Sequence, residues 1–393
     1  QYGQGVQGEY DGTSKLSYGP RMEGQMIENW REGREDYAMV PQGSHIRDFY
    51  NVGSNFTNNL SVSGGNQTVT ARLSIMDSRN KGITPRRKLD RQSVDLNSTL
   101  SITDDIKVNA KVNFIREINN HRAFRGEYGT MMQLVFIPRS IRTEDLLPPV
   151  DENLQQVIYG GATSFYDNPY FQTQYLRNDE GERRRVISLL KADWEIADWL
   201  TWTMKGGVDY YRDNTENFGH QDLLGNGGSY SVGEKHLQEV NVDGLLKFQE
   251  DITPDINLTL SAGASLMNRH VENLYNSANQ LIVQNLYSLN NGENFTHSHS
   301  LSEKEIQSVY GFTNIAYRNW AYLDVTARND WSSTLPEDNW SFFYPSVSAS
   351  IVASDMLEDL GSELPSWISF AKIRGSIAEV GNDTDPYRLR STY

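Results

Sequence analysis

The chain has 393 residues, no cysteine and a formal net charge of −15 at pH 7. The acidic excess argues against a nucleic-acid-binding surface, and the absence of cysteine excludes disulfides, thiol catalysis and Cys-ligated metal sites. No stretch approaches the roughly 18 apolar residues that a membrane helix requires, but membrane β-barrels escape that test because only every second strand residue faces lipid.

The first segment, residues 1–57, is rich in Gly, Tyr and charge and has no sustained hydrophobic period. We interpret it as a long loop region, extracellular if the chain spans a membrane, with a disordered tail as the alternative. Its opening, QYGQGVQGEY, lacks the basic region and apolar core of a signal peptide. We therefore expect a fragment of a longer exported protein.

Alternation of apolar and polar residues dominates the rest of the chain and predicts strands with one apolar and one polar face. In residues 106–114, five apolar residues alternate with two Lys and two Asn, which favours a position between lipid and a wet lumen. In residues 256–266, we predict that Leu258 faces lipid and Thr259 faces the lumen. The twelve predicted strands are 58–66, 68–76, 93–102, 106–114, 186–196, 200–210, 239–249, 256–266, 308–317, 321–330, 343–355 and 371–380.

Short and long connections alternate between these strands. Tight turns such as Gly64-Gly65-Asn66, where glycine supplies positive φ angles, alternate with loops at about 117–183, 213–235 and 269–302. Outer-membrane barrels have short periplasmic turns and long extracellular loops, whereas a soluble sandwich has no reason to sort its loops by side. The predicted fold class is therefore all-β, an antiparallel membrane β-barrel.

The predicted domains follow from this pattern. Residues 58–380 form a transmembrane barrel segment that includes the long loop 117–183, and residues 381–393 begin a further extracellular loop. Inside the long loop, GTMMQLVFIPRS predicts one short buried helix that ends before Pro138.

Catalytic and metal-binding candidates are weak. His297 and His299 would share one face of a strand, but a metal site needs further ligands. Asp330, Glu337 and Asp338 crowd one loop, where solvated charge is the simpler interpretation than paired acid and base. We therefore predict no enzyme activity, no cofactor and no metal.

Binding chemistry is better placed in the long loop, in the segment SFYDNPYF. Aromatic faces beside amides and carboxylates suit sugar rings or peptide side chains, and ordinary loop packing is the alternative interpretation. The candidate substrate-binding residues are Phe165, Tyr166, Asn168, Tyr170 and Phe171.

Two segments near the C-terminus, ARNDWSSTLPEDNWSFFYPSVSASIVASD and FAKIRGSIAEVGND, resemble the barrel signature of SusC/RagA-like TonB-linked outer-membrane proteins. The residues LSVSGGN and NPYF are further landmarks of that family, and the resemblance covers essentially the whole chain. The matching motif residues, which we interpret as structural, are Arg328, Asp330, Ser332, Ser333, Pro345, Ser346, Lys372, Arg374, Gly381 and Asn382.

The resemblance implies about twelve strands of a larger barrel in the outer membrane of a Gram-negative bacterium. It implies a TonB-dependent importer of oligosaccharide or peptide that works with a SusD-like surface lipoprotein as its lid. The TonB complex would act through a plug domain that we expect to be absent from this chain. A passive or secretion-type pore is the alternative, and an outer-membrane enzyme a weaker one.

Overall fold

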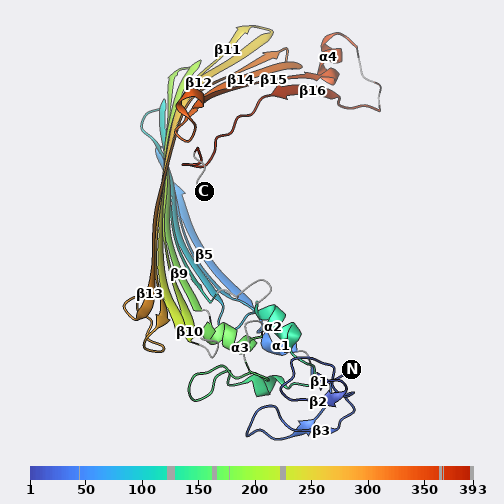
Figure 1. The fold of residues 1–393 in the computed structure, drawn as a ribbon. Helices are drawn as coiled ribbons and strands as arrows, with labels where there is room; N and C mark the ends of the chain where they lie inside the picture. Colours follow the sequence, from blue (N-terminus) through green and yellow to red (C-terminus); the bar gives the residue numbers. More distant parts are fainter. Residues whose placement is uncertain are drawn as a thin grey trace.

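The computed structural model describes residues 1–43, 45–121, 129–161, 166–176, 178–221, 227–362, 365 and 367–389. Two parts make up the molecule (Figure 1): a large curved sheet, and a group of short elements at one end of its strands. We call the sheet the wall. We call the group the loop assembly, and it comprises the described residues of 1–50 and 129–176.

The wall is one antiparallel sheet of twelve strands in the described part of the chain, each paired with its neighbours in sequence. The strands are β5 (Ser54–Gly65), β6 (Val69–Lys81), β7 (Lys88–Ser101), β8 (Ile106–Asn120), β9 (Asn178–Ala197), β10 (Leu200–Gln221), β11 (Gly227–Thr253), β12 (Ile256–Leu281), β13 (Gly292–Tyr317), β14 (Ala321–Ser332), β15 (Ser341–Val352) and β16 (Lys372–Ala378). Within those ranges β5 and β16 do not pair with each other, so the sheet is open.

The register of the wall collects the apolar side chains on one face. Val62 pairs with Leu73, Leu73 with Leu96, and Leu96 with Val112. Val62 is 66% exposed and the other three are 43% exposed, so the described protein leaves this face uncovered. An exposed apolar band on an antiparallel sheet is the lipid-facing surface of an outer-membrane barrel.

The same register places Leu258 opposite Ile315 and Thr259 opposite Asn314, so these two residues lie on opposite faces as predicted. The polar face is the concave one, because the segment after β16 runs along the inside of the curve (Figure 1) and bonds to that face.

Short turns connect the strands at the end of the wall away from the loop assembly. Arg318 and Asn319 have φ angles of 47° and 59°, the backbone of a two-residue hairpin turn. At Gly64-Gly65-Asn66 the prediction of positive φ was wrong: the Asn66 side chain instead accepts hydrogen bonds from the backbone N–H groups of Thr68 and Val69. The helix α4 (Ala353–Asp359) joins β15 to β16 at this end.

Two predicted loops are largely strands. β10 and β11 extend to Gln221 and Gly227, and β12 and β13 extend to Leu281 and Gly292, so most of 213–235 and of 269–302 is paired. Above a membrane both faces of a strand meet water, so no apolar alternation is needed there. The sequence pattern therefore fades although the backbone ladder continues.

The loop assembly contains short elements around a core of its own. They are β1 (Gly5–Val6), β2 (Glu9–Tyr10), β3 (Met26–Ile27), β4 (Tyr37–Ala38), α1 (His45–Phe49), α2 (Thr130–Phe136), η1 (Thr143–Leu146), α3 (Pro169–Phe171) and η2 (Gln172–Leu176). The helix α2 confirms the short helix predicted before Pro138. The described residues of 1–50 thus fold against the long loop instead of forming a plain extended loop. Among the described residues, no helix is long and apolar enough to cross a membrane.

Candidate functional site

The loop assembly is held together by a buried hydrophobic cluster that joins two distant segments. Phe49, from the first segment, packs with Leu134, Ile141 and Tyr170 of the second, and each is at most 9% exposed. Burying such side chains contributes about 1.5–3 kcal/mol each before the cost of ordering the chain. The cluster therefore fixes a defined surface at the end of the wall where the long loops lie.

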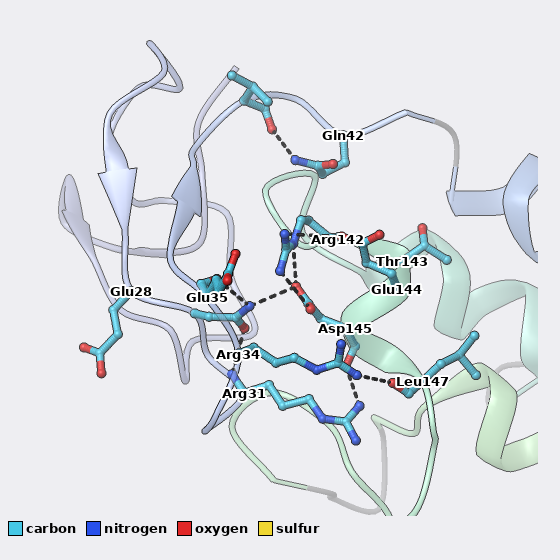
Figure 2. Close-up of polar contacts among 12 residues, drawn as sticks. Glu28, Arg31, Arg34, Glu35, Gln42, Arg142, Thr143, Glu144, Asp145 and Leu147 are labelled. Carbon is cyan, nitrogen blue, oxygen red and sulfur yellow. Dashed lines mark hydrogen bonds and ion pairs between the residues drawn. The ribbon is translucent and has the colours of Figure 1, made fainter.

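A buried carboxylate links the same two segments (Figure 2). Asp145 is 0% exposed, and its side chain accepts hydrogen bonds from Asn29 at 3.2 Å and from Nε of Arg142 at 2.7 Å. Its backbone carbonyl accepts a hydrogen bond from Arg31 at 2.8 Å, and Arg34 donates to the carbonyl of Leu147 at 3.0 Å. A buried charge without partners is very costly, so this network fixes the position of the first segment on the second.

Arg142 is the cation that compensates Asp145. The hydrogen bond to Asp145 raises the pKa of the Arg142 guanidinium above its usual value, and burial opposes this shift. The same guanidinium lies 4.5 Å from the ring centre of Tyr37 in β4. Burial raises the pKa of the Tyr37 hydroxyl, so this ring stays neutral beneath the cation. The sequence contained no signal for this site, because its members are scattered over more than a hundred residues.

The predicted binding segment lies largely inside the loop assembly. Asn168 is 0% exposed; its side chain donates to the carbonyls of Leu146 and Val157 at 2.8 Å and accepts from the backbone N–H of Tyr170 at 2.9 Å. Tyr170 and Phe171 are 9% and 0% exposed. These three side chains are buried among protein groups, which favours the packing alternative over direct substrate contact.

Tyr166 is the predicted binding residue that remains partly exposed. Its ring lies 5.6 Å from the ammonium of Lys15 and packs edge-on against Phe136. Phe165 lies outside the described residues.

The family-motif residues of β14 gather on the concave face of the wall. Arg328 donates to Asp330 and to Ser308, each at 2.8 Å, and its guanidinium lies over the ring of Tyr310. Asp330 also accepts a hydrogen bond from the hydroxyl of Tyr344 in β15. The motif therefore joins β13, β14 and β15 by polar contacts in the lumen.

The segment that follows β16 crosses the same face and is fixed there by Asp383. The Asp383 side chain is 8% exposed and accepts hydrogen bonds from Lys304 at 2.7 Å and from Ser332 at 2.6 Å. Gly381 lies against Phe342, where a Cβ would approach the ring to 2.4 Å, so a larger residue would have to displace that ring. Ser332 and Gly381 were identified from the motif, whereas the role of Asp383 was missed.

The remaining motif residues have separate structural contacts. The Ser333 hydroxyl accepts from the backbone of Glu305, and the Pro345 carbonyl accepts from that of Glu379. Ser346 shares a hydrogen bond with Thr326, and Lys372 lies over the ring of Tyr322. Exposed positions are occupied by Arg374 and Asn382.

His297 and His299 lie on β13 instead of in a loop, and they contact Asn276 and Glu272. No group of three or more His, Asp or Glu residues within the described ranges is placed to hold a metal ion. Asp330 belongs to the luminal network, while Glu337 and Asp338 are exposed, so they do not form a carboxylate pair.

No protein-family model matches the chain. A curated protein named TonB-dependent receptor P26, from Formosa agariphila, is 23% identical over 345 residues, which are 84% of this chain and 33% of that protein. The chain thus spans about a third of the length of this relative. The solved structure of the RagAB peptide transporter superimposes with a TM-score of 0.74 at 19% identity, over 90% of this chain and 40% of that one. The RagAB peptide importer in its open-open state gives a TM-score of 0.70 at 19% identity, over 85% of this chain and 37% of that one.

These likenesses confirm the resemblance to SusC/RagA-like TonB-linked outer-membrane proteins that the motifs indicate. At this identity the structural match shows the fold alone, which is part of the wall of a large antiparallel β-barrel. The similar proteins are a receptor and a transporter, not enzymes.

Proposed function

We propose that this chain is part of a TonB-dependent importer that brings peptide or oligosaccharide through the outer membrane. In this proposal the loop assembly meets a SusD-like surface lipoprotein, and TonB acts through a plug domain carried by another part of the full-length protein. Strands outside the described residues complete the barrel, because an open edge exposes unpaired backbone groups that lipid cannot satisfy.

The observation that carries the proposal is the folded loop assembly at the long-loop end of a polar concave wall. A passive pore needs only the wall, with short unstructured loops connecting its strands. Here the described residues of 1–50 and 129–176 are ordered around a buried core and the Asp145 network, which is costly in chain entropy. An ordered surface of this kind supports a role in holding a partner or substrate at the mouth.

Uptake by cells that produce the full-length protein tests the proposal. A labelled peptide and a labelled oligosaccharide are each supplied with the proton gradient intact and collapsed. We expect uptake of at least one probe to stop when the gradient collapses. Uptake that continues undiminished would identify a passive pore and overturn the proposal.

Point substitutions test the loop assembly more sharply than deletion of residues 163–178, which would remove buried Asn168, Tyr170 and Phe171. Asp145→Ala breaks the buried network, while Glu144→Ala removes a side chain that is 68% exposed together with its outer ion pair to Arg142. We expect the first to reduce co-purification of the lipoprotein and uptake, and the second to change neither. Equal uptake by both variants would mean that transport does not require the intact loop assembly.

A further inference from the structure

A pocket of about 560 Å³ lies on the outward, apolar side of the wall, beside the end of β14 and the start of β15. Its lining residues are Glu305, Gln307, Trp331, Ser332, Ser333 and Trp340. We propose that it binds a membrane lipid whose head group ends in an ammonium group. This inference goes beyond the proposed import function and does not depend on it. The volume lies within the range of about 300–1,000 Å³ typical of small-ligand sites.

The strand register places the pocket on the face that carries the apolar band. Glu305, Gln307 and Val309 are alternate residues of β13, so their side chains share one face of the strand. Gln307 lies opposite Leu266 of β12, which is 42% exposed and belongs to the apolar band. β13 and β14 are interior strands of the wall, flanked by β12 and β15. A plug domain in the lumen and further strands at the two edges therefore leave this face to lipid.

Two indole rings line the pocket, and the hairpin between β14 and β15 positions both. Trp331 lies opposite Gln307 in the register of β13 and β14. Trp340 follows the short helix η3 (Glu337–Asn339), and its carbonyl accepts a hydrogen bond from the backbone N–H of Ser332 at 2.9 Å. Trp340 is 49% exposed. Indole rings concentrate where lipid head groups meet the apolar part of a membrane, so the pocket lies at that level.

The pocket contains a carboxylate, and none of its lining residues is a lysine or an arginine. Oε1 of Glu305 accepts a hydrogen bond from Nε2 of Gln307 at 2.8 Å, which fixes the carboxylate beside the indoles. The adjacent cation, Lys304, lies on the opposite face of β13 and pairs with Asp383 at 2.7 Å. Within the described ranges no cation forms an ion pair with Glu305. A charge at the edge of lipid is costly unless it is paired, so the matching ligand group is a cation.

An ammonium group fits both the carboxylate and the indoles. Aromatic faces attract cations, most strongly when water is excluded, and a carboxylate accepts charge-assisted hydrogen bonds from ammonium N–H groups. A head group whose only charge is a phosphate would instead be repelled by Glu305.

The apolar band beside the pocket identifies the ligand as a lipid. Val309 and Phe343 lie on the same outward face, opposite Asn329 on either side, and are 54% and 60% exposed. Acyl chains attached to a head group in the pocket would cover these side chains and remove apolar surface from water. A free amine would leave them uncovered, so the pocket and the band together complement an amphiphile.

Lipid titration of the full-length protein, followed by native mass spectrometry in a polyoxyethylene detergent, tests this site. The probes are a phosphatidylethanolamine and its N-acetylated form, which differ by the ammonium charge. We expect Glu305→Gln to weaken binding of the first lipid about tenfold and to leave the second unchanged. Glutamine keeps the acceptor that Gln307 uses, so the pocket retains its shape. Trp331→Ala should weaken binding of the first lipid about fivefold.

The matched controls remove the same chemical groups elsewhere on the protein. Glu303→Gln also removes a carboxylate from the outward face of β13, but Glu303 contacts His270 at 3.1 Å and lies outside the pocket lining. Trp367→Ala removes an indole that is 81% exposed, in the connection between α4 and β16. Both controls should bind the two lipids as the native protein does.

Each of the following results would overturn the inference. Equal affinity of the native protein for the two lipids would mean that the ammonium group is not recognised, and unchanged affinity in Glu305→Gln would exclude the carboxylate. Ethanolamine that binds as tightly as the lipid would assign the pocket to a soluble amine, and stronger binding of dodecyl maltoside would assign it to sugar. A dimer that Trp340→Ala dissociates, with lipid affinity unchanged, would assign it to a second copy of the chain. Uptake that does not depend on the proton gradient would overturn the import function alone.

Discussion

The wall and the loop assembly differ in how far their apolar side chains are exposed. In the wall, Leu60 and Val62 are 67% and 66% exposed, while in the loop assembly Phe49 and Ile141 are 2% and 0% exposed. The wall therefore depends on lipid to cover its apolar face, and its backbone ladder satisfies its own hydrogen bonds. The loop assembly carries its own core, as a small water-soluble domain does. One chain thus contains two parts whose stability depends on different solvents.

The largest effect that would sharpen this comparison is expected at Asp145. Asp145→Ala leaves Arg142 and Asn29 without their buried partner and should destabilise the loop assembly by about 3–5 kcal/mol. Hydrogen exchange of the full-length protein should show lost protection in residues 129–161, with the strands of the wall unchanged. Glu144→Ala, the exposed control, should cost less than about 1 kcal/mol. Equal loss of protection in the wall would mean that the two parts are one cooperative unit.

The lipid dependence of the wall is tested at Leu96 and its neighbour Asn97. Leu96→Arg places a charge on the apolar face and should destabilise the barrel by about 2–4 kcal/mol near the membrane midplane. Asn97→Arg, on the concave face, should be tolerated. Folding yield in lipid vesicles measures both variants. Similar folding yields for the two variants would contradict the assignment of Leu96 to the lipid face and Asn97 to the concave face.

A smaller effect is expected where the segment after β16 is fixed to the concave face. Asp383→Asn removes the charge paired with Lys304. It should weaken the attachment of residues 379–389 to the wall by about 1–3 kcal/mol and leave the rest of the protein unchanged. These 393 residues contain no cysteine, so Thr384→Cys gives their single labelling site, and its reaction rate should rise in the Asp383→Asn background. Asp385→Asn, at an exposed position, is the control and should leave the rate unchanged.

The smallest effect concerns pH and should appear in the loop assembly alone. Burial lowers the pKa of His45 below its usual 6.5, and the charge of Arg139 adds to the effect. The folded state therefore favours neutral His45, so this contribution to stability is complete above pH 6.5 and falls as the pH drops below it. Proteolysis of residues 1–50 should accelerate between pH 7 and pH 5.5, and His45→Gln should flatten that dependence. A native profile as flat as that of His45→Gln would contradict the assignment.

Local rules predicted the twelve strands and their faces, because a strand between lipid and water must alternate. The same rules missed the outer parts of β10 to β13, where water on both sides removes the need for alternation. They also placed Asn168, Tyr170 and Phe171 on a surface, because residue type alone does not distinguish an aromatic that binds from one that packs.

The sequence by itself determined the antiparallel wall, the sorting of its connections and the place of Arg328 on the polar face, whereas it assigned Asp330 to a loop and the structure places it in β14. These follow from contacts between residues close in sequence or from strand periodicity. Only the tertiary structure decided that Asn29 meets Asp145, that Asp383 meets Lys304, and that Gly263 lets Tyr310 reach Asp243. Those pairs are separated by 116, 79 and 67 residues, and no periodic pattern specifies contacts that depend on how the whole chain folds back on itself.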